Sequence, residues 1–87
     1  MLTQTIFISN PTGIHARPAA LIVNCAKKFT SLIHLAHGDK VVSIKSVINI
    51  LSLGLEFNDQ ITLSVDGQDE QEALTALVEL FASFVQH

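Results

Sequence analysis

The chain has 87 residues, of which 48% are hydrophobic and 15% charged, so we expect a single packed domain over residues 1–87 and not a disordered chain. Its formal net charge of −3 argues against nucleic acid as a partner, because binding to phosphate backbones needs a basic patch. No segment approaches the roughly 20 apolar residues of a membrane span, no signal peptide is visible, and Cys25 has no partner for a disulfide, which together predict a cytoplasmic protein.

The first third of the chain predicts a strand, a turn and a helix. Residues 2–8 alternate in the manner of a strand, residues 10–13 contain turn formers, and residues 16–28 show helical periodicity. Pro18 fits the first helical turn, where its missing N–H has no partner to lose. The apolar residues of this helix form one core-facing stripe, Ala19, Ile22, Val23 and Ala26.

The middle of the chain predicts a hairpin and a short helix. Residues 31–37 form a second strand with Ile33 and Leu35 on one face, and Gly38 and Asp39 turn the chain into a third strand over residues 40–44. Ser46 is a strong helix N-cap, and Gly54 is suited to end the short helix between them, although β-branched residues make that helix weak by propensity.

The last third predicts a strand and a closing helix. Residues 60–65 alternate, with their apolar side chains on one face. Asp69 and Glu72 have the spacing of a capping box, and an apolar stripe follows at Leu74, Leu77, Val78, Phe81 and Val85. The order is βαββαβα, which predicts an α+β open-faced sandwich with a four-stranded antiparallel sheet covered on one face by helices.

His15 and Arg17 stand at the start of the first predicted helix. The N–H groups there have no partner within the helix, and the positive end of the helix dipole points outward, so the position attracts anions such as phosphate. We expect the dipole to favour the neutral, nucleophilic form of the His15 imidazole, and Arg17 adds a permanent charge that pairs well with phosphate oxygens. This pattern indicates a site for a transient phosphohistidine.

Three segments carry a family resemblance: Gly13–Ala19, Lys45–Gly54 and Gly67–Leu74. They resemble, at the family's spacing, the active site, the regulatory-serine segment and the last helix of HPr, the histidine-containing phosphocarrier of the bacterial phosphoenolpyruvate:sugar phosphotransferase system. The resemblance covers essentially the whole chain and implies the same open-faced sandwich. It implies that Nδ1 of His15 accepts phosphate from phospho-enzyme I, that Arg17 stabilises it, and that enzyme II A domains receive it. Such a carrier is not an enzyme and needs no cofactor of its own, because Mg²⁺ and phosphoenolpyruvate belong to enzyme I.

Ser46 has two interpretations. It is a helix cap by its position, and the resemblance to Gram-positive members of the family implies that an HPr kinase/phosphorylase phosphorylates it. Phosphoserine at a helix N-terminus is electrostatically tolerated, so the added charge would act on partners more than on the fold. Serine also occurs at this place in relatives that lack the kinase. A catabolite-control transcription factor is the further partner that the resemblance implies.

A docking surface for these proteins is expected beside His15, formed by Ala16, Ala20, Val47, Ile48 and Leu51. Some of Val47, Ile48 and Leu51 must also face the core, and Leu21 and Cys25 are candidates to extend the surface. Close Gram-positive relatives commonly have methionines at the positions of Ile48 and Leu51 and glycine at that of Asn49. Since isoleucine adapts less well than methionine, affinity for particular partners is in question. We expect a monomer.

Two other functions remain open at this stage. A regulatory relative in Gram-positive bacteria acts only as a corepressor through its phosphoserine, but it carries glutamine in place of the active-site histidine, whereas this chain has His15. A carrier in a nitrogen-related or sugar-independent phosphorelay is the other alternative. We expect no metal site, because His34 and His37 lie three apart on a predicted strand and point to opposite faces.

Overall fold

The computed structural model describes the backbone of residues 1–86 and the side chains of residues 1–84. The predicted order βαββαβα is confirmed, with a short 3₁₀ helix at the end. The predicted bounds of the elements either match the observed ones or differ from them by a residue or two. The elements are β1 (Leu2–Phe7), α1 (Ala16–Ala26), β2 (Leu32–His37), β3 (Lys40–Ser43), α2 (Val47–Leu51), β4 (Gln60–Asp66), α3 (Glu70–Ala82) and η1 (Ser83–Gln86).

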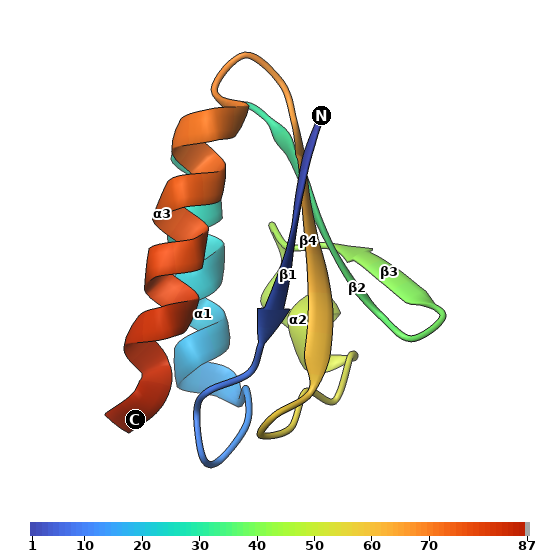
Figure 1. Cartoon of the computed structure of the whole chain (residues 1–87), viewed down its shortest axis with the longest axis vertical. Coiled ribbons are helices and arrows are strands. Elements are labelled where there is room, and N and C mark those ends of the chain that lie inside the picture. The colour runs from blue at the N-terminus through green and yellow to red at the C-terminus, as the bar shows by residue number, and fades with distance from the viewer. Residues whose placement is uncertain (87) are drawn as a thin grey trace.

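The sheet is antiparallel throughout, with the strand order β1-β4-β2-β3. Because β4 joins the sheet between β1 and β2, the last strand in sequence lies at its centre. Helices α1 and α3 lie side by side against one face, and the hairpin of β2 and β3 extends away from them (Figure 1). This arrangement confirms the predicted α+β sandwich. No helix within residues 1–86 is long and apolar enough to cross a membrane.

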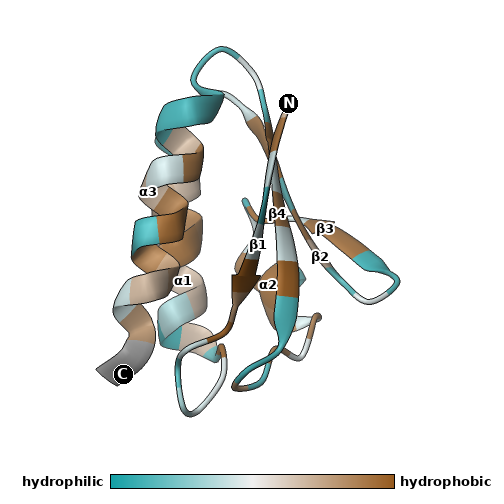
Figure 2. Cartoon of the chain, in the orientation of Figure 1, coloured by the Kyte–Doolittle hydropathy of each residue, from teal (hydrophilic) through white to brown (hydrophobic). Residues whose placement is uncertain are grey.

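The core lies between the sheet and the helices. Ile33 and Leu35 of β2 are at most 1% exposed, as is the alternating set of β4. All four residues of the predicted α1 stripe are buried, so the helical and strand periodicities assign the inner faces correctly. Figure 2 shows the same pattern, with hydrophobic segments along the centre of the sheet and on the sides of the helices that face it. The buried β4 side chains are Ile61, Leu63 and Val65.

Helix α3 packs on the core through Ala73, Leu77 and Phe81, while Leu74 and Val78 of the predicted stripe are half-buried against the same cluster. Val85, the last residue of that stripe, lies outside the residues whose side chains are described. Phe84 of η1 is 1% exposed, and its ring meets that of Phe81 edge-on at a centroid distance of 6.1 Å. Phe84 therefore belongs to the core and packs against α3.

The predicted capping box at the start of α3 is wrong. Asp69 occupies the N-cap position, but its side chain makes no capping hydrogen bond. Its carboxylate instead accepts from the Ser31 hydroxyl and from the N–H groups of Ser31 and Thr30, at 3.0 and 2.8 Å for the two N–H groups. Asp69 therefore joins the start of α3 to the segment that enters β2. The Ser31 hydroxyl, followed by the Thr30 N–H, holds the pKa of this carboxyl below its usual value.

We expect Asp69→Asn to destabilise the protein in a pH-dependent manner. Because the folded pKa is lower than the unfolded one, the charged carboxylate contributes stability above about pH 4, and this contribution is lost as the pH falls through the folded pKa. Urea unfolding at pH 7 should therefore give a lower midpoint for the variant than for the parent. At pH 2–3 the two midpoints should converge. Asp39→Asn, in the exposed β2–β3 turn, is the control and should change neither midpoint; an equal gap at both pH values for Asp69→Asn would contradict the assignment.

Candidate functional site

A tight turn leads from β1 to α1. The main-chain oxygen of Asn10 accepts from the Gly13 N–H at 2.9 Å, and Asn10 Oδ1 accepts from the Thr12 N–H and hydroxyl at 3.2 and 3.1 Å. The next N–H, that of Ile14, donates to the main-chain oxygen of Leu55 at 3.0 Å. The turn is thus fixed both internally and against the segment before β4. Sequence reasoning placed Asn10 in a turn but did not assign these side-chain bonds to it.

Gly13 is required by this close approach. Its φ is +74°, in the left-handed region that favours glycine. A Cβ at this position would lie 2.5 Å from the main-chain oxygen of Leu55, far inside van der Waals contact. The backbone therefore passes Leu55 at a distance that only glycine allows.

His15 is the N-cap residue of α1, as predicted. Its φ and ψ of −109° and −166° are extended, and its main-chain oxygen accepts the first helical hydrogen bond, from Ala19 at 3.0 Å. The imidazole makes no capping bond and is exposed, as are Ala16 and Arg17. The N–H groups of Ala16 and Arg17 have no acceptor within the helix, because the first turn never supplies one. An exposed imidazole therefore lies at the start of the helix, two residues before the exposed side chain of Arg17.

Ser46 is the N-cap of α2, and its hydroxyl oxygen accepts from the Asn49 N–H at 3.4 Å. This confirms its structural role. Two further bonds hold the segment in place: Asn49 Nδ2 donates to the Ser43 oxygen at 3.1 Å, and Lys45 Nζ donates to the Phe29 oxygen at 3.0 Å. Sequence reasoning did not assign these bonds. They explain how a five-residue helix rich in β-branched residues forms despite its weak propensity.

The five predicted docking residues differ in exposure. Ile48 is 78% exposed and Leu51 is 40% exposed, whereas Val47 is half-buried and packs against the core. On α1, Ala16 is exposed and Ala20 is half-buried. Helix α2, which carries Ile48 and Leu51 together with Val47, packs against α1.

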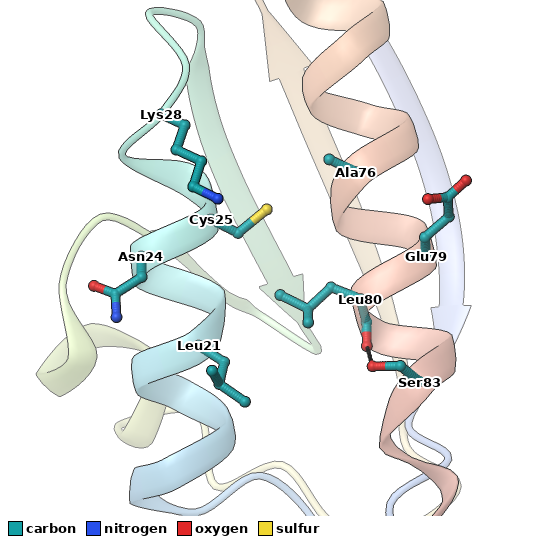
Figure 3. A pocket seen from close by; sticks show the side chains of 8 residues that line it. All are labelled: Leu21, Asn24, Cys25, Lys28, Ala76, Glu79, Leu80 and Ser83. Atoms are coloured by element: carbon teal, nitrogen blue, oxygen red, sulfur yellow. Dashed lines mark hydrogen bonds between the residues drawn. The ribbon is translucent and has the colours of Figure 1, made fainter.

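Leu21 and Cys25 occupy a different place from the one suggested for them. They line a groove of about 440 Å³ together with α3 residues, and no α2 residue contributes to its lining (Figure 3). Burial raises the pKa of the Cys25 thiol, and the nearby charge of Lys28 only partly opposes this. The thiol therefore stays protonated near neutral pH, as expected for a packing residue and not for a nucleophile. The lining is completed by Asn24, Ala76, Glu79, Leu80 and Ser83.

His34 and His37 of β2 take part in ordinary contacts. His37 places Nδ1 3.3 Å from the Leu53 oxygen and Nε2 3.4 Å from a carboxylate oxygen of Asp59. His34 lies in β2 opposite Ser43 and Ser64. Among the described residues, no three His, Cys, Asp or Glu side chains are grouped to hold a metal ion.

Comparison with known proteins identifies the family. A model described as "PTS HPr component phosphorylation site" matches residues 2–83. The phosphocarrier protein HPr of Mycoplasma genitalium is 49% identical over 71 residues, which are 80% of this chain and 81% of that protein. The chain therefore belongs to the HPr family, the phosphocarriers of the phosphotransferase system.

Solved structures agree with this assignment. HPr of Thermoanaerobacter tengcongensis is 46% identical, with a TM-score of 0.94 over 100% of this chain and 98% of that one. Crh, the catabolite repression protein of Bacillus subtilis, is 38% identical with a TM-score of 0.77 over 100% of both chains, and its structure is described as a dimer with a swapped domain. The family thus includes carriers and a protein of catabolite repression on one fold.

We expect Gly13→Ala to destabilise the protein more than Gly38→Ala. Both glycines have positive φ, at 74° and 61°, so each alanine variant costs about 1–2 kcal/mol in backbone strain. Only at Gly13 does the new Cβ also meet a main-chain oxygen, whereas nothing lies within 4 Å at Gly38. Chemical denaturation should therefore show that Gly13→Ala lowers the free energy of unfolding by at least about 1 kcal/mol more than Gly38→Ala does. Equal losses of unfolding free energy in the two variants would mean that the turn moves away from Leu55 without an energetic cost.

Proposed function

We propose that His15 accepts a phosphoryl group on Nδ1 from phospho-enzyme I and passes it to enzyme II A domains during sugar uptake. The observation that carries this proposal is the exposed imidazole at the N-cap of α1, unused in capping and next to an exposed Arg17. Family membership supplies the class of reaction. The chain acts in the cytoplasm as a covalent carrier, and the partner enzymes supply most of the catalysis.

The transfer needs little from this chain beyond a nucleophile and an anion site. The Nδ1 lone pair attacks phosphorus, the bond from phosphorus to the donor's nitrogen breaks, and that nitrogen leaves with the electron pair. The phosphoryl group then bears its negative charge beside the first N–H groups of α1. Because these dipoles are fixed by the fold, they stabilise the charge without reorganising. The site is exposed, so this stabilisation is moderate and the return transfer remains accessible.

Arg17 contributes the mobile part of the site. Its guanidinium is always charged and offers two parallel donors to phosphate oxygens. The side chain is exposed and lies two residues after the nucleophile, so it is able to follow the phosphoryl group as a partner approaches. We assign it to stabilisation of the phosphate in both directions of transfer.

Partners dock on the apolar surface formed by Ala16, Ala20, Ile48 and Leu51. Val47, which is half-buried, packs between this surface and the core. The 78% exposure of Ile48 supports this assignment, because a large apolar side chain exposed to that degree on a short anchored helix is suited to fill a partner's pocket. The chain acts as a monomer in these encounters. The swapped dimer described for Crh makes oligomeric state a property to measure, by sedimentation of the purified chain.

Ser46 is the regulatory position in this proposal. It is half-buried at the start of α2, two residues before Ile48, so a phosphate on its hydroxyl would add charge at the edge of the docking surface. HPr kinase/phosphorylase is the modifying enzyme, and a catabolite-control transcription factor is the reader of the phosphoserine. The alternative is a chain that acts only as such a corepressor, as the catabolite repression function of Crh suggests. The presence of both His15 and Arg17 favours the carrier, and the two roles are compatible.

We expect His15→Ala to abolish labelling by enzyme I and phosphoenolpyruvate while the fold is retained, because the side chain is exposed and makes no capping bond. Intact mass and acid lability of the phosphate are the measurements. Arg17→Lys keeps the charge but loses the two parallel donors, so transfer should slow without vanishing. Acid-labile phosphate on the His15→Ala variant would overturn the assignment of the phosphoacceptor. An unchanged rate for Arg17→Lys would remove that residue from the site.

We expect Ser46→Asp to accept phosphate from enzyme I about tenfold to a hundredfold more slowly at low salt, corresponding to about 1–3 kcal/mol of docking free energy. The new charge must be desolvated beside Ile48 and repels an acidic partner. Salt should restore part of the rate, since repulsion is screened within about 10 Å at 0.1 M. Thr75→Asp, on the exposed side of α3, is the matched control for added charge and should transfer at the parent rate. Equal rates for Ser46→Asp and the parent would leave Ser46 as a helix cap.

A further inference from the structure

Asn10 is one of two buried polar residues among the side chains that the structure describes, the other being Ser31. Asn10 is 0% exposed, and its side chain accepts two hydrogen bonds from Thr12 through Oδ1. The other half of its amide, Nδ2, is buried without a hydrogen-bond partner in the part of the chain that the structure describes. A buried donor without a partner destabilises a fold, so this residue is not explained by stability alone.

The two oxygens of Asn10 hold successive residues of the turn. Asn10 precedes Pro11, which restricts its backbone to extended conformations and contributes no N–H of its own. Within that frame Oδ1 holds the N–H and hydroxyl of Thr12, and the main-chain oxygen holds the N–H of Gly13. The side chain therefore closes a second, smaller turn inside the first.

These bonds end two residues before His15. Gly13 is fixed by Asn10, and Ile14 is fixed by the Leu55 oxygen at 3.0 Å, so His15 enters α1 from a backbone that is tied at each preceding residue from Thr12 onward. His15 itself has an exposed side chain without a capping bond. The position of its Cα and the direction of its Cα–Cβ bond are accordingly set by the preceding backbone, which Asn10 holds together with the Leu55 oxygen.

We propose that Asn10 is a positioning residue for the phosphoacceptor. The inference rests on the proposed role of His15 and deepens it: Asn10 does not touch the phosphoryl group, and it acts through Thr12 and Gly13. In-line transfer requires the attacking nitrogen to be held near the phosphorus in the correct direction, and small displacements of a reacting group reduce the rate of the chemical step strongly. Loss of this anchor affects the transfer step and leaves the docking surface of Ile48 and Leu51 unchanged.

The test is the kinetics of phosphorylation by enzyme I and phosphoenolpyruvate. Asn10→Ala removes the acceptor and should lower kcat about tenfold, with KM within about twofold of the parent. Asn10→Ser restores a neutral acceptor on a shorter side chain and should recover kcat to within about threefold of the parent. Thr12→Val removes only the hydroxyl donor, leaves the buried position intact, and should give a smaller loss of about twofold to threefold.

Asp69→Asn is the matched control, because the Asp69 carboxylate likewise accepts from backbone N–H groups, but at the start of α3. The start of α3 lies at the opposite end of the molecule from the start of α1 (Figure 1). Asp69→Asn should lower stability without changing kcat. Unchanged kcat in Asn10→Ala, a loss that appears in KM instead, or no recovery in Asn10→Ser would overturn the proposal. So would a kcat loss in Asp69→Asn as large as that of Asn10→Ala.

Amide hydrogen exchange separates this inference from the proposed function. The N–H groups of Gly13 and Ile14 should exchange faster in Asn10→Ala than in the parent and return toward the parent rate in Asn10→Ser. This readout needs no phosphoryl transfer. If the parent chain is not labelled on His15, the proposed function fails whatever the exchange shows; if the parent is labelled but exchange at Gly13 is the same in all three proteins, the positioning role fails alone.

Discussion

The contact between two loops at one end of the sheet is the constraint on which the site depends. The segment after β1 and the segment before β4 exchange backbone hydrogen bonds, from Ile8 to the Asp59 oxygen, from Asn58 to the Ile8 oxygen, and from Ile14 to the Leu55 oxygen. The last of these brings Gly13 so close to Leu55 that no side chain fits. Because α1 begins directly after this contact, the position of its first turn is fixed by the sheet.

This constraint explains how an exposed residue is held with definite geometry. The His15 side chain is exposed, but its backbone follows a turn in which the N–H groups of Thr12, Gly13 and Ile14 are all hydrogen-bonded. It also begins a helix whose buried stripe packs on the core. The anion site that we propose consists of helical N–H groups, which the fold orients whether or not phosphate is bound. A carrier needs this combination, because its nucleophile must be open to two successive partners and cannot be enclosed.

The start of α3 and the start of α1 lie at opposite ends of the molecule (Figure 1), and we assign them different roles. At one end, at the start of α3, Asp69 binds the segment that enters β2 and connects α3 to the sheet. At the other end the loop contact, α2 and the start of α1 gather the groups assigned to chemistry and docking. Helix α2 is held by side-chain bonds from Lys45 and Asn49 and not by helical propensity, which allows its outward side chains to be apolar.

Local patterns in the sequence determined most of the fold. Alternation in β4 and the stripe of α1 identified the buried faces, and the Asn-Pro-x-Gly turn before Pro18 placed His15 at a helix start, because these features depend on residues only a few positions apart. The tertiary structure alone decided what Asp69 binds, what Asn10 holds and which helix Leu21 and Cys25 face. Asp69 and Ser31 are 38 residues apart, and β4 enters between strands far earlier in the chain. Such contacts are set by how the layers pack, and no local periodicity encodes them.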